Sequence, residues 1–140
     1  MGSVTVTHKG VNDTKLHAVL ARSPGLLKNM FMRAVRVQSA ARKNLSRPPQ
    51  RVDTGALRAS IAVVPFRWQG LPAFSIGTNL KYAMFVHEGT GLYGPKHHLI
   101  TPTHAQVMVF KVQGGRKVFT KISRGMPPNP FMKDALSAAG

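Results

Sequence analysis

Histidines and acidic residues are the first places to look for chemistry in this chain. His87 and Glu88 begin like the zinc-binding H-E-x-x-H motif, but the position that requires a second histidine is Gly91. Three further histidines lie in a segment that has the composition of a loop: His97, His98 and His104. Metal-binding histidines are usually oriented by carboxylate or carbonyl partners, and carboxylates are scarce in this sequence. We therefore expect no metal site.

Acidic residues are too few for most catalytic arrangements. The chain has four, namely Asp13, Asp53, Glu88 and Asp134. General acid–base chemistry needs two carboxylates, or a carboxylate and a histidine, held together, and two of the four are explained as helix caps. The Gly114-Gly115 pair is flanked by Gln113 and Arg116, so it does not extend into a phosphate-binding loop. The chain has no cysteine and no G-x-S-x-G elbow. The sequence thus predicts no catalytic residue and no cofactor, and a protein that is not an enzyme.

The charge of the chain is strongly one-sided. Its 140 residues include 20 Lys and Arg against 4 Asp and Glu, a formal net charge of +16, yet only 17% of residues are charged and 43% are hydrophobic. This is the composition of a folded protein that lacks acids, not of a disordered polycation. Between Asp13 and Asp53 there is no acid and there are nine bases: Lys15, Arg22, Lys28, Arg33, Arg36, Arg42, Lys43, Arg47 and Arg51. Such a segment predicts an anionic partner.

Most of these bases fall on one predicted helix. Ser23-Pro24 is a typical helix start, nothing interrupts the helix before Leu45, and Pro48-Pro49 ends it. At about 100° per residue, one arc of this helix is apolar: Leu26, Leu27, Met30, Phe31, Ala34, Val37, Ala41 and Leu45. The opposite arc carries the basic ridge, which consists of Lys28, Arg33, Arg36 and Lys43, with Arg42 at its edge. Because no acid on the helix can pair with these bases, the ridge repels itself unless an anionic partner docks on it. The alternative is an ordinary solvated helix face.

The other elements predict an α+β fold. We expect a short helix over 15–22, an Asp53-capped helix over 56–60, a hairpin with strands at 60–68 and 73–78 and a turn at 70–72, and a second hairpin with strands at 106–112 and 117–123. Residues 81–87 suit either a strand or two helical turns. Asn129 and Pro130 should start a last helix that buries Phe131, Ala135 and Leu136. Phe66, Trp68 and Tyr82 are expected to pack in the core.

These elements together give one domain over residues 1–140. Its small, mostly antiparallel sheet is packed by the long N-terminal amphipathic helix and the short C-terminal helix. Residues 1–12 form an extended arm and residues 105–123 an inserted, protruding β-hairpin. No apolar run approaches the ~18 residues of a membrane span, and the N-terminus lacks the apolar core of a signal peptide. We expect a soluble protein of intracellular type that binds no membrane.

Three segments, in this order, resemble one protein family. They are V-D-T-G-A-L-R-A-S-I over 52–61, Y-A-M-F-V-H-E-G-T over 82–90 and P-F-M-K-D-A-L over 130–136. Together they resemble the gene-ten-like neck or tail-completion family of long-tailed bacteriophages, a family of minor tail components. The residues that match its motifs are Asp53, Gly55, Leu57, Tyr82, Glu88, Gly89, Thr90, Pro130 and Phe131. The chain departs from the family pattern at His87, directly before the acid, and in a longer insertion over 92–125.

The resemblance implies a structural virion protein at the head–tail junction, present in the host cytoplasm during assembly. It implies a homo-oligomeric ring, most plausibly six-fold, around the path of the genomic DNA. Its partners would be the adjacent head-closure or connector protein and the tail-terminator or tail-tube protein, with possible nonspecific contact with DNA. Glu88 would fix its glycine-rich loop or pair with a base of a neighbouring subunit; the alternative is a surface carboxylate without a role.

A second hypothesis is a sequence-nonspecific basic DNA-binding protein that acts on its own. Basic ridges bind phosphates and release counterions, so such binding is steeply salt-dependent. The sequence shows no zinc finger, RNA-binding aromatic pair or clear helix-turn-helix. Any contact with DNA should therefore be electrostatic. A metal-dependent enzyme that uses the loop histidines is the third and weakest hypothesis.

Overall fold

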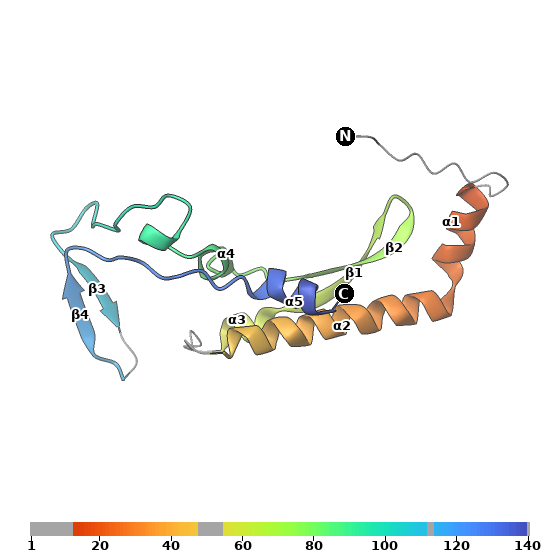
Figure 1. Cartoon of the computed structure of the whole chain (residues 1–140), viewed down its shortest axis with the longest axis horizontal. Helices are drawn as coiled ribbons and strands as arrows, with labels where there is room; N and C mark the ends of the chain where they lie inside the picture. Colours follow the sequence, from red (N-terminus) through yellow and green to blue (C-terminus); the bar gives the residue numbers. More distant parts are fainter. Residues whose placement is uncertain (1–12, 48–54, 112–113, 140) are drawn as a thin grey trace.

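A 22-residue helix, α2 (Pro24–Leu45), organises the molecule. The computed structural model of the chain describes residues 13–47, 55–111 and 114–139. In Figure 1, α2 lies along the long axis, the first hairpin and α5 lie beside it, and the second hairpin lies at the far end from α1. The architecture is α+β, as the sequence predicts, with two separate two-stranded antiparallel sheets.

Helix α2 begins and ends where the sequence predicts. Ser23 is its N-cap, and the Ser23 side chain accepts a hydrogen bond from the backbone N–H of Leu26 at 3.4 Å. Pro24 follows at the first helical position, where the missing N–H has no intrahelical partner to lose. The helix ends at Leu45; the predicted stop signal at 48–49 lies outside the described residues.

Helix α1 (Asp13–Arg22) also agrees with the prediction. It meets α2 at Ser23, whose backbone N–H bonds to the carbonyl of Leu20 at 3.3 Å. Figure 1 shows α1 turned sharply away from the line of α2. The extended arm predicted for residues 1–12 lies outside the described residues.

The first hairpin follows the short helix α3 (Ala56–Ser60) and consists of β1 (Ala62–Trp68) and β2 (Leu71–Gly77). The two-residue turn is Gln69-Gly70, with φ angles of 50° and 80°. Positive φ at both turn residues matches the natural twist of a hairpin. The predicted turn at 70–72 is therefore wrong: Leu71 already pairs with Trp68. Pro65 lies within β1, which is an edge strand in a two-stranded sheet, as its proline requires.

The segment that sequence periodicity left open is helical. Helix α4 spans Ala83–Glu88 and buries Ala83 and Val86. Gly89, with φ 82°, ends it. A single 3₁₀ turn, η1 (Gly91–Tyr93), follows.

The second hairpin forms over a shorter range than predicted. Strands β3 (Met108–Lys111) and β4 (Lys117–Thr120) pair antiparallel, Val109 opposite Phe119. The hairpin stands at one end of the molecule, away from α2 and α5 (Figure 1).

The chain on either side of this hairpin is tied together by backbone hydrogen bonds, which we call the clasp. The N–H groups of Thr90 and Leu92 donate to the carbonyls of Met126 and Arg124, each at 2.9 Å. Further out, Ile100 and Ser123 exchange two bonds of 2.9 Å. The insertion is therefore anchored to the body at its base.

The C-terminal helix α5 spans Phe131–Ala139 and lies on α2. Phe131 and Ala135 are buried as predicted, at 1% and 0% exposure. Leu136 was expected beside them, but it is 57% exposed, because the next residue in a helix points about 100° away.

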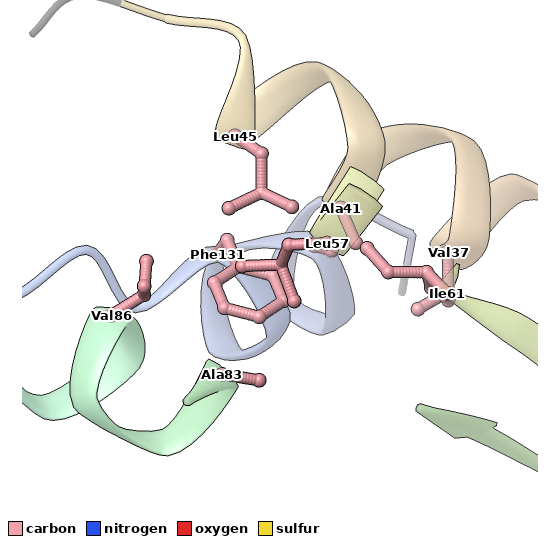
Figure 2. Packing of buried hydrophobic residues seen from close by; sticks show 9 residues of the cluster. Val37, Ala41, Leu45, Leu57, Ile61, Ala83, Val86 and Phe131 are labelled. Atoms are coloured by element: carbon pink, nitrogen blue, oxygen red, sulfur yellow. The ribbon is translucent and has the colours of Figure 1, made fainter. Parts of the chain in front are cut away.

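The hydrophobic core lies where α2, α3, α4 and α5 meet. Figure 2 shows Phe131 at its centre, between side chains of α2 on one side and Val86 and Ala83 of α4 on the other. Ile61, directly after α3, is fully buried. The buried members of this core are Val37, Ala41, Leu45, Leu57, Ile61, Ala83, Val86, Phe131 and Ala135.

The predicted apolar arc of α2 is buried only toward its C-terminal end. Ala34, Val37, Ala41 and Leu45 are buried, whereas Leu26, Leu27 and Met30 are half-buried and Phe31 is 47% exposed. The ring of Phe31 does contact the ring of Phe74 on β2, with centroids 5.7 Å apart. No other described element covers the N-terminal half of the arc as closely as α5 covers the other half.

Three aromatic residues expected in the core are on the surface instead. Phe66 is 43% exposed, Trp68 63% and Tyr82 44%. The β1–β2 hairpin is too narrow to bury both of its faces, because only one face turns toward α2. Among the described helices, none combines the length and the apolar character needed to cross a membrane.

Candidate functional site

The basic ridge of α2 is a real surface feature. Lys28, Arg33, Arg36 and Lys43 are all exposed, and within the described ranges none of the four has a hydrogen-bonding or ion-pair partner for its charge. A groove of about 420 Å³ runs along the N-terminal part of the ridge, lined by Gly25, Lys28, Asn29, Met32, Arg33 and Arg36. Three cations beside a half-exposed methionine form a surface suited to an anionic partner with some apolar character.

Arg42 does not belong to the ridge. Its guanidinium turns inward, and Nη2 donates to the backbone carbonyl of Ile61 at 2.9 Å. The side-chain amide of Gln38 donates to the same carbonyl at 2.7 Å. The Nε of Arg42 is buried without a hydrogen-bonding partner. Arg42 therefore attaches α2 to the chain after α3, and its prediction as a partner-facing base is wrong.

The first family-like segment forms the turn and helix that precede β1. Gly55 is the N-cap of α3 with φ 73°, a conformation that suits glycine. Asp53, the predicted cap, lies outside the described residues. Leu57 is buried in the core. Ser60 Oγ donates to the carbonyl of Leu57 at 2.8 Å and shares a 2.6 Å hydrogen bond with Thr78 Oγ1. These contacts are structural.

The second segment builds α4 and one side of the clasp. Tyr82 precedes α4 and is exposed. Gly89 packs so closely that a Cβ there would lie 2.8 Å from the carbonyl oxygen of Met126. Thr90 Oγ1 accepts a hydrogen bond from the N–H of Met126 at 3.0 Å. The Gly-Thr pair thus closes the base of the inserted hairpin.

Glu88 is exposed at the end of α4. Within the described part of the chain its carboxylate has no hydrogen bond or ion pair. It lies on the wall of a pocket of about 370 Å³ that is also lined by Met84, Phe85, Lys96 and His98. Glu88 therefore does not fix its own loop, which leaves a contact with a partner or no role at all.

The third segment seats α5. Phe131 fills the centre of the core, and its backbone carbonyl accepts a hydrogen bond from Asn44 Nδ2 at 3.2 Å. α5 begins at Phe131, and the carbonyl of Pro130 accepts from the N–H of Asp134 at 2.9 Å. The backbone N–H of Asn129, the predicted cap, donates to the carbonyl of Val86, joining α5 to α4.

Asn44 stabilises the fold from within the core, and the sequence pattern did not single it out. It is 9% exposed and lies on α2 between the core residues Ala41 and Leu45. A polar residue on an apolar helical stripe is the signal that identifies it, because such a residue needs a buried partner.

The histidines do not gather. The rings of His87 and Phe131 pack edge to face, with centroids 5.6 Å apart. His97 Nδ1 lies 3.2 Å from the carbonyl of Leu92, His98 lines the pocket beside Glu88, and His104 is exposed. In the part of the chain that the structure describes, no three His, Asp or Glu side chains lie close enough to bind a metal together.

Comparison of the chain with models of protein families, with curated proteins and with solved structures finds no match.

Proposed function

We propose that this chain is a structural subunit that assembles with copies of itself into a ring. In the setting suggested by the three motifs, the ring is part of a bacteriophage neck and joins head to tail around the DNA path. The observation that carries the proposal is the distribution of large apolar side chains. Ten hydrophobic residues are buried in the described part of the molecule, while many large ones are more than a third exposed, among them Trp68, Phe119 and Leu136.

Exposed apolar residues scattered singly are normal, but extended patches mark contact surfaces. Six of these residues lie on the two hairpins, namely Val64, Phe66, Trp68, Val109, Phe110 and Phe119, and the others lie on the helices and loops. A subunit whose two-stranded sheets pack against neighbouring subunits exposes apolar residues on its hairpins in this way. The basic ridge then remains free on α2 to dock on an acidic neighbouring ring, such as a head-closure, connector or tail-terminator protein, or on the DNA.

Solution mass and DNA affinity, measured on the same preparation of the full chain, test the proposal. We expect a discrete oligomer by sedimentation velocity, and weak duplex binding at physiological salt. A monomer that binds duplex DNA tightly, with affinity falling steeply as salt rises, would overturn it.

The second candidate function, nonspecific DNA binding by the isolated chain, is favoured by the unpaired charges of the ridge. Substituting Arg33, Arg36 and Lys43 together by glutamine separates the two candidates. Each lost phosphate contact should flatten the log–log salt dependence of DNA affinity by about 0.9. In an assembly subunit, the same variant should form oligomers normally and lose binding to an acidic partner ring.

A further inference from the structure

Neither sheet of the molecule is complete. The β1–β2 and β3–β4 hairpins are each two-stranded, and in the described residues neither pairs with a third strand. A two-stranded hairpin is marginally stable in water, and independent stability usually needs a third strand or a packed face. β1–β2 obtains such packing on one face from α2. β3–β4 obtains none comparable from the described helices (Figure 1).

The outer face of β1–β2 is apolar and free of charge. Because side chains alternate along a strand, Val64, Phe66 and Trp68 share one face. The opposite face includes Phe74, which contacts α2, so this one points away from it. Val64 is 54% exposed, Phe66 43% and Trp68 63%. Their pairing partners on β2 are the uncharged residues Ser75, Ala73 and Leu71.

A hollow lies on the same outer face. Its volume is about 420 Å³, and its walls include Ala62, Val64, Ser75 and Gly77. Three of these four, Ala62, Ser75 and Gly77, are small residues on the outward side of the hairpin, which leaves the hollow beside Val64. It adjoins the apolar stripe and offers space for a protruding side chain.

The β3–β4 hairpin presents the protruding side chains. Val109 and Phe119 are paired on one face and are 51% and 64% exposed. The next pair on this face, Lys111 and Lys117, lies toward the turn, where long side chains can reach past a contact to solvent. The Val109–Phe119 pair is therefore more exposed than the apolar pair on the other face of the hairpin, Phe110 and Val118.

Within one chain the two features cannot meet. Figure 1 places β3–β4 at one end of the long axis, while the turn of β1–β2 points to the other end, near α1. We propose that the Val109–Phe119 face of one copy docks on the outer face of β1–β2 of a second copy. This inference rests on the proposed self-assembly and names the surfaces that make it.

Charge favours this contact over others between copies. Each chain carries +16, so two copies repel least where they meet through surface of low charge. The basic ridge of α2 cannot provide such a surface, whereas all eight residues on the outer face of β1–β2 are uncharged and the Val109–Phe119 face carries only Lys111 and Lys117, next to its turn.

The exposed aromatic rings supply part of the area that a specific interface needs. If each aromatic side chain offers about 200 Å², the exposed parts of Phe66, Trp68 and Phe119 total roughly 350 Å². That is about a third of the ~1,000 Å² buried in the smallest specific interfaces. The valines, the walls of the hollow and the strand edges lie around them to supply the rest.

The contact joins two different surfaces and is therefore heterologous. Each copy has one of each, so association continues until a ring closes or a filament grows. This geometry gives a test that no symmetric dimer can imitate.

The test uses two variants. W68E puts a negative charge on the outer face of β1–β2, the receiving face, and F119E puts one on the Val109–Phe119 face of β3–β4, the docking face. L136E is the control, since Leu136 is comparably exposed on α5 and the charge change is identical. Circular dichroism checks that all three fold. We expect wild type and L136E to be oligomers by sedimentation velocity, and W68E and F119E each to be monomers.

Mixing the two monomeric variants is the decisive step. W68E retains an intact docking face and F119E an intact receiving face, so the mixture should form a 1:1 dimer and nothing larger. If both variants stay as large as wild type, or L136E dissociates equally, the named surfaces are wrong while self-assembly stands. If wild type is itself a monomer at about 1 mM, self-assembly fails, and this inference fails with it.

Discussion

Neighbouring residues on α2 have opposite roles, and Arg42 and Lys43 show this most clearly. Both are bases in the same acid-free segment, and one helical step separates them. Arg42 bonds to the carbonyl of Ile61 inside the fold, whereas Lys43 is exposed and has no such partner in the described chain. Net charge alone therefore overstates the size of the docking surface.

Arg42→Ala should lower the free energy of unfolding by about 1–2 kcal/mol, because it removes a charge-assisted hydrogen bond to a backbone carbonyl. Lys43→Ala should leave stability within about 0.5 kcal/mol. Urea denaturation of both variants measures the difference. Equal stability of the two would contradict the inward role of Arg42.

Asn44 makes a second residue-scale prediction. Asn44→Ala leaves the buried carbonyl of Phe131 without its side-chain donor and should cost about 1–3 kcal/mol. Asn29→Ala, at an exposed position of the same helix, is the matched control and should be nearly neutral. Thermal unfolding compares them, and a neutral Asn44→Ala would show that the hydrogen bond to α5 contributes nothing.

Two glycines, Gly91 in the clasp and Gly114 in the hairpin turn, give a third residue-scale prediction. Gly91 has φ 64°, and a Cβ there would overlap the backbone carbonyl of Arg124. Gly91→Ala should therefore destabilise by at least about 2 kcal/mol, from left-handed strain plus a backbone clash. Gly114→Ala has the same kind of strain at φ 93° but open space around it, so about 1 kcal/mol is expected. If both variants lose the same stability, close backbone packing is not what the clasp requires.

At the scale of elements, local signals were sufficient for the helices with clear ends. Ser23-Pro24 defines the start of α2 because capping depends only on residues within one turn. The helix α4 could not be decided from the sequence, because six residues show no reliable period and its helicity depends on Val86 meeting the core. The β1–β2 turn was displaced because Leu71-Pro72 resembles turn sequence, yet Gln69-Gly70 adopts the two positive φ angles.

Ser23 allows the capping argument to be measured. Ser23→Ala should destabilise the protein by about 0.5–1 kcal/mol, since a donor of the first turn of α2 loses its acceptor. Ser39→Ala, at an exposed mid-helix position, should be neutral or slightly stabilising because alanine has the higher helix propensity. Chemical denaturation should rank them in this order, and the reverse order would refute the cap.

Which face of an element is exposed was harder to predict than whether the element is a helix or a strand. Phe66 and Trp68 have the composition of a core strand, and only the tertiary arrangement shows that their face of β1 is uncovered. A hydrophobic pattern predicts that a face is buried. It does not show whether that face packs against the same chain or against another one. The candidate interface was therefore visible only in the structure, while the basic ridge, apart from Arg42, was visible in the sequence.

At the scale of the whole molecule, two surfaces differ in character. The ridge on α2 is basic, and the outer face of β1–β2 is neutral and apolar. This division suits a subunit that contacts its own copies through one kind of surface and an anionic partner through the other. It also implies that salt affects the two contacts differently.

Raising salt from about 0.1 to 0.5 M should weaken binding to any anionic partner, because the charges of the ridge are exposed and screened. Self-association through the apolar faces should persist or strengthen, because screening reduces the repulsion between copies. Sedimentation of the protein alone across this salt range checks the second statement. Dissociation at high salt would show that ionic contacts, not the hairpin faces, join the copies.

Whether this chain is an assembly subunit is decided by the mass of the protein in sedimentation velocity at about 0.5 M salt. We expect one discrete species several times the 15.2 kDa of the chain. A single species of 15.2 kDa at every concentration up to about 1 mM would contradict it.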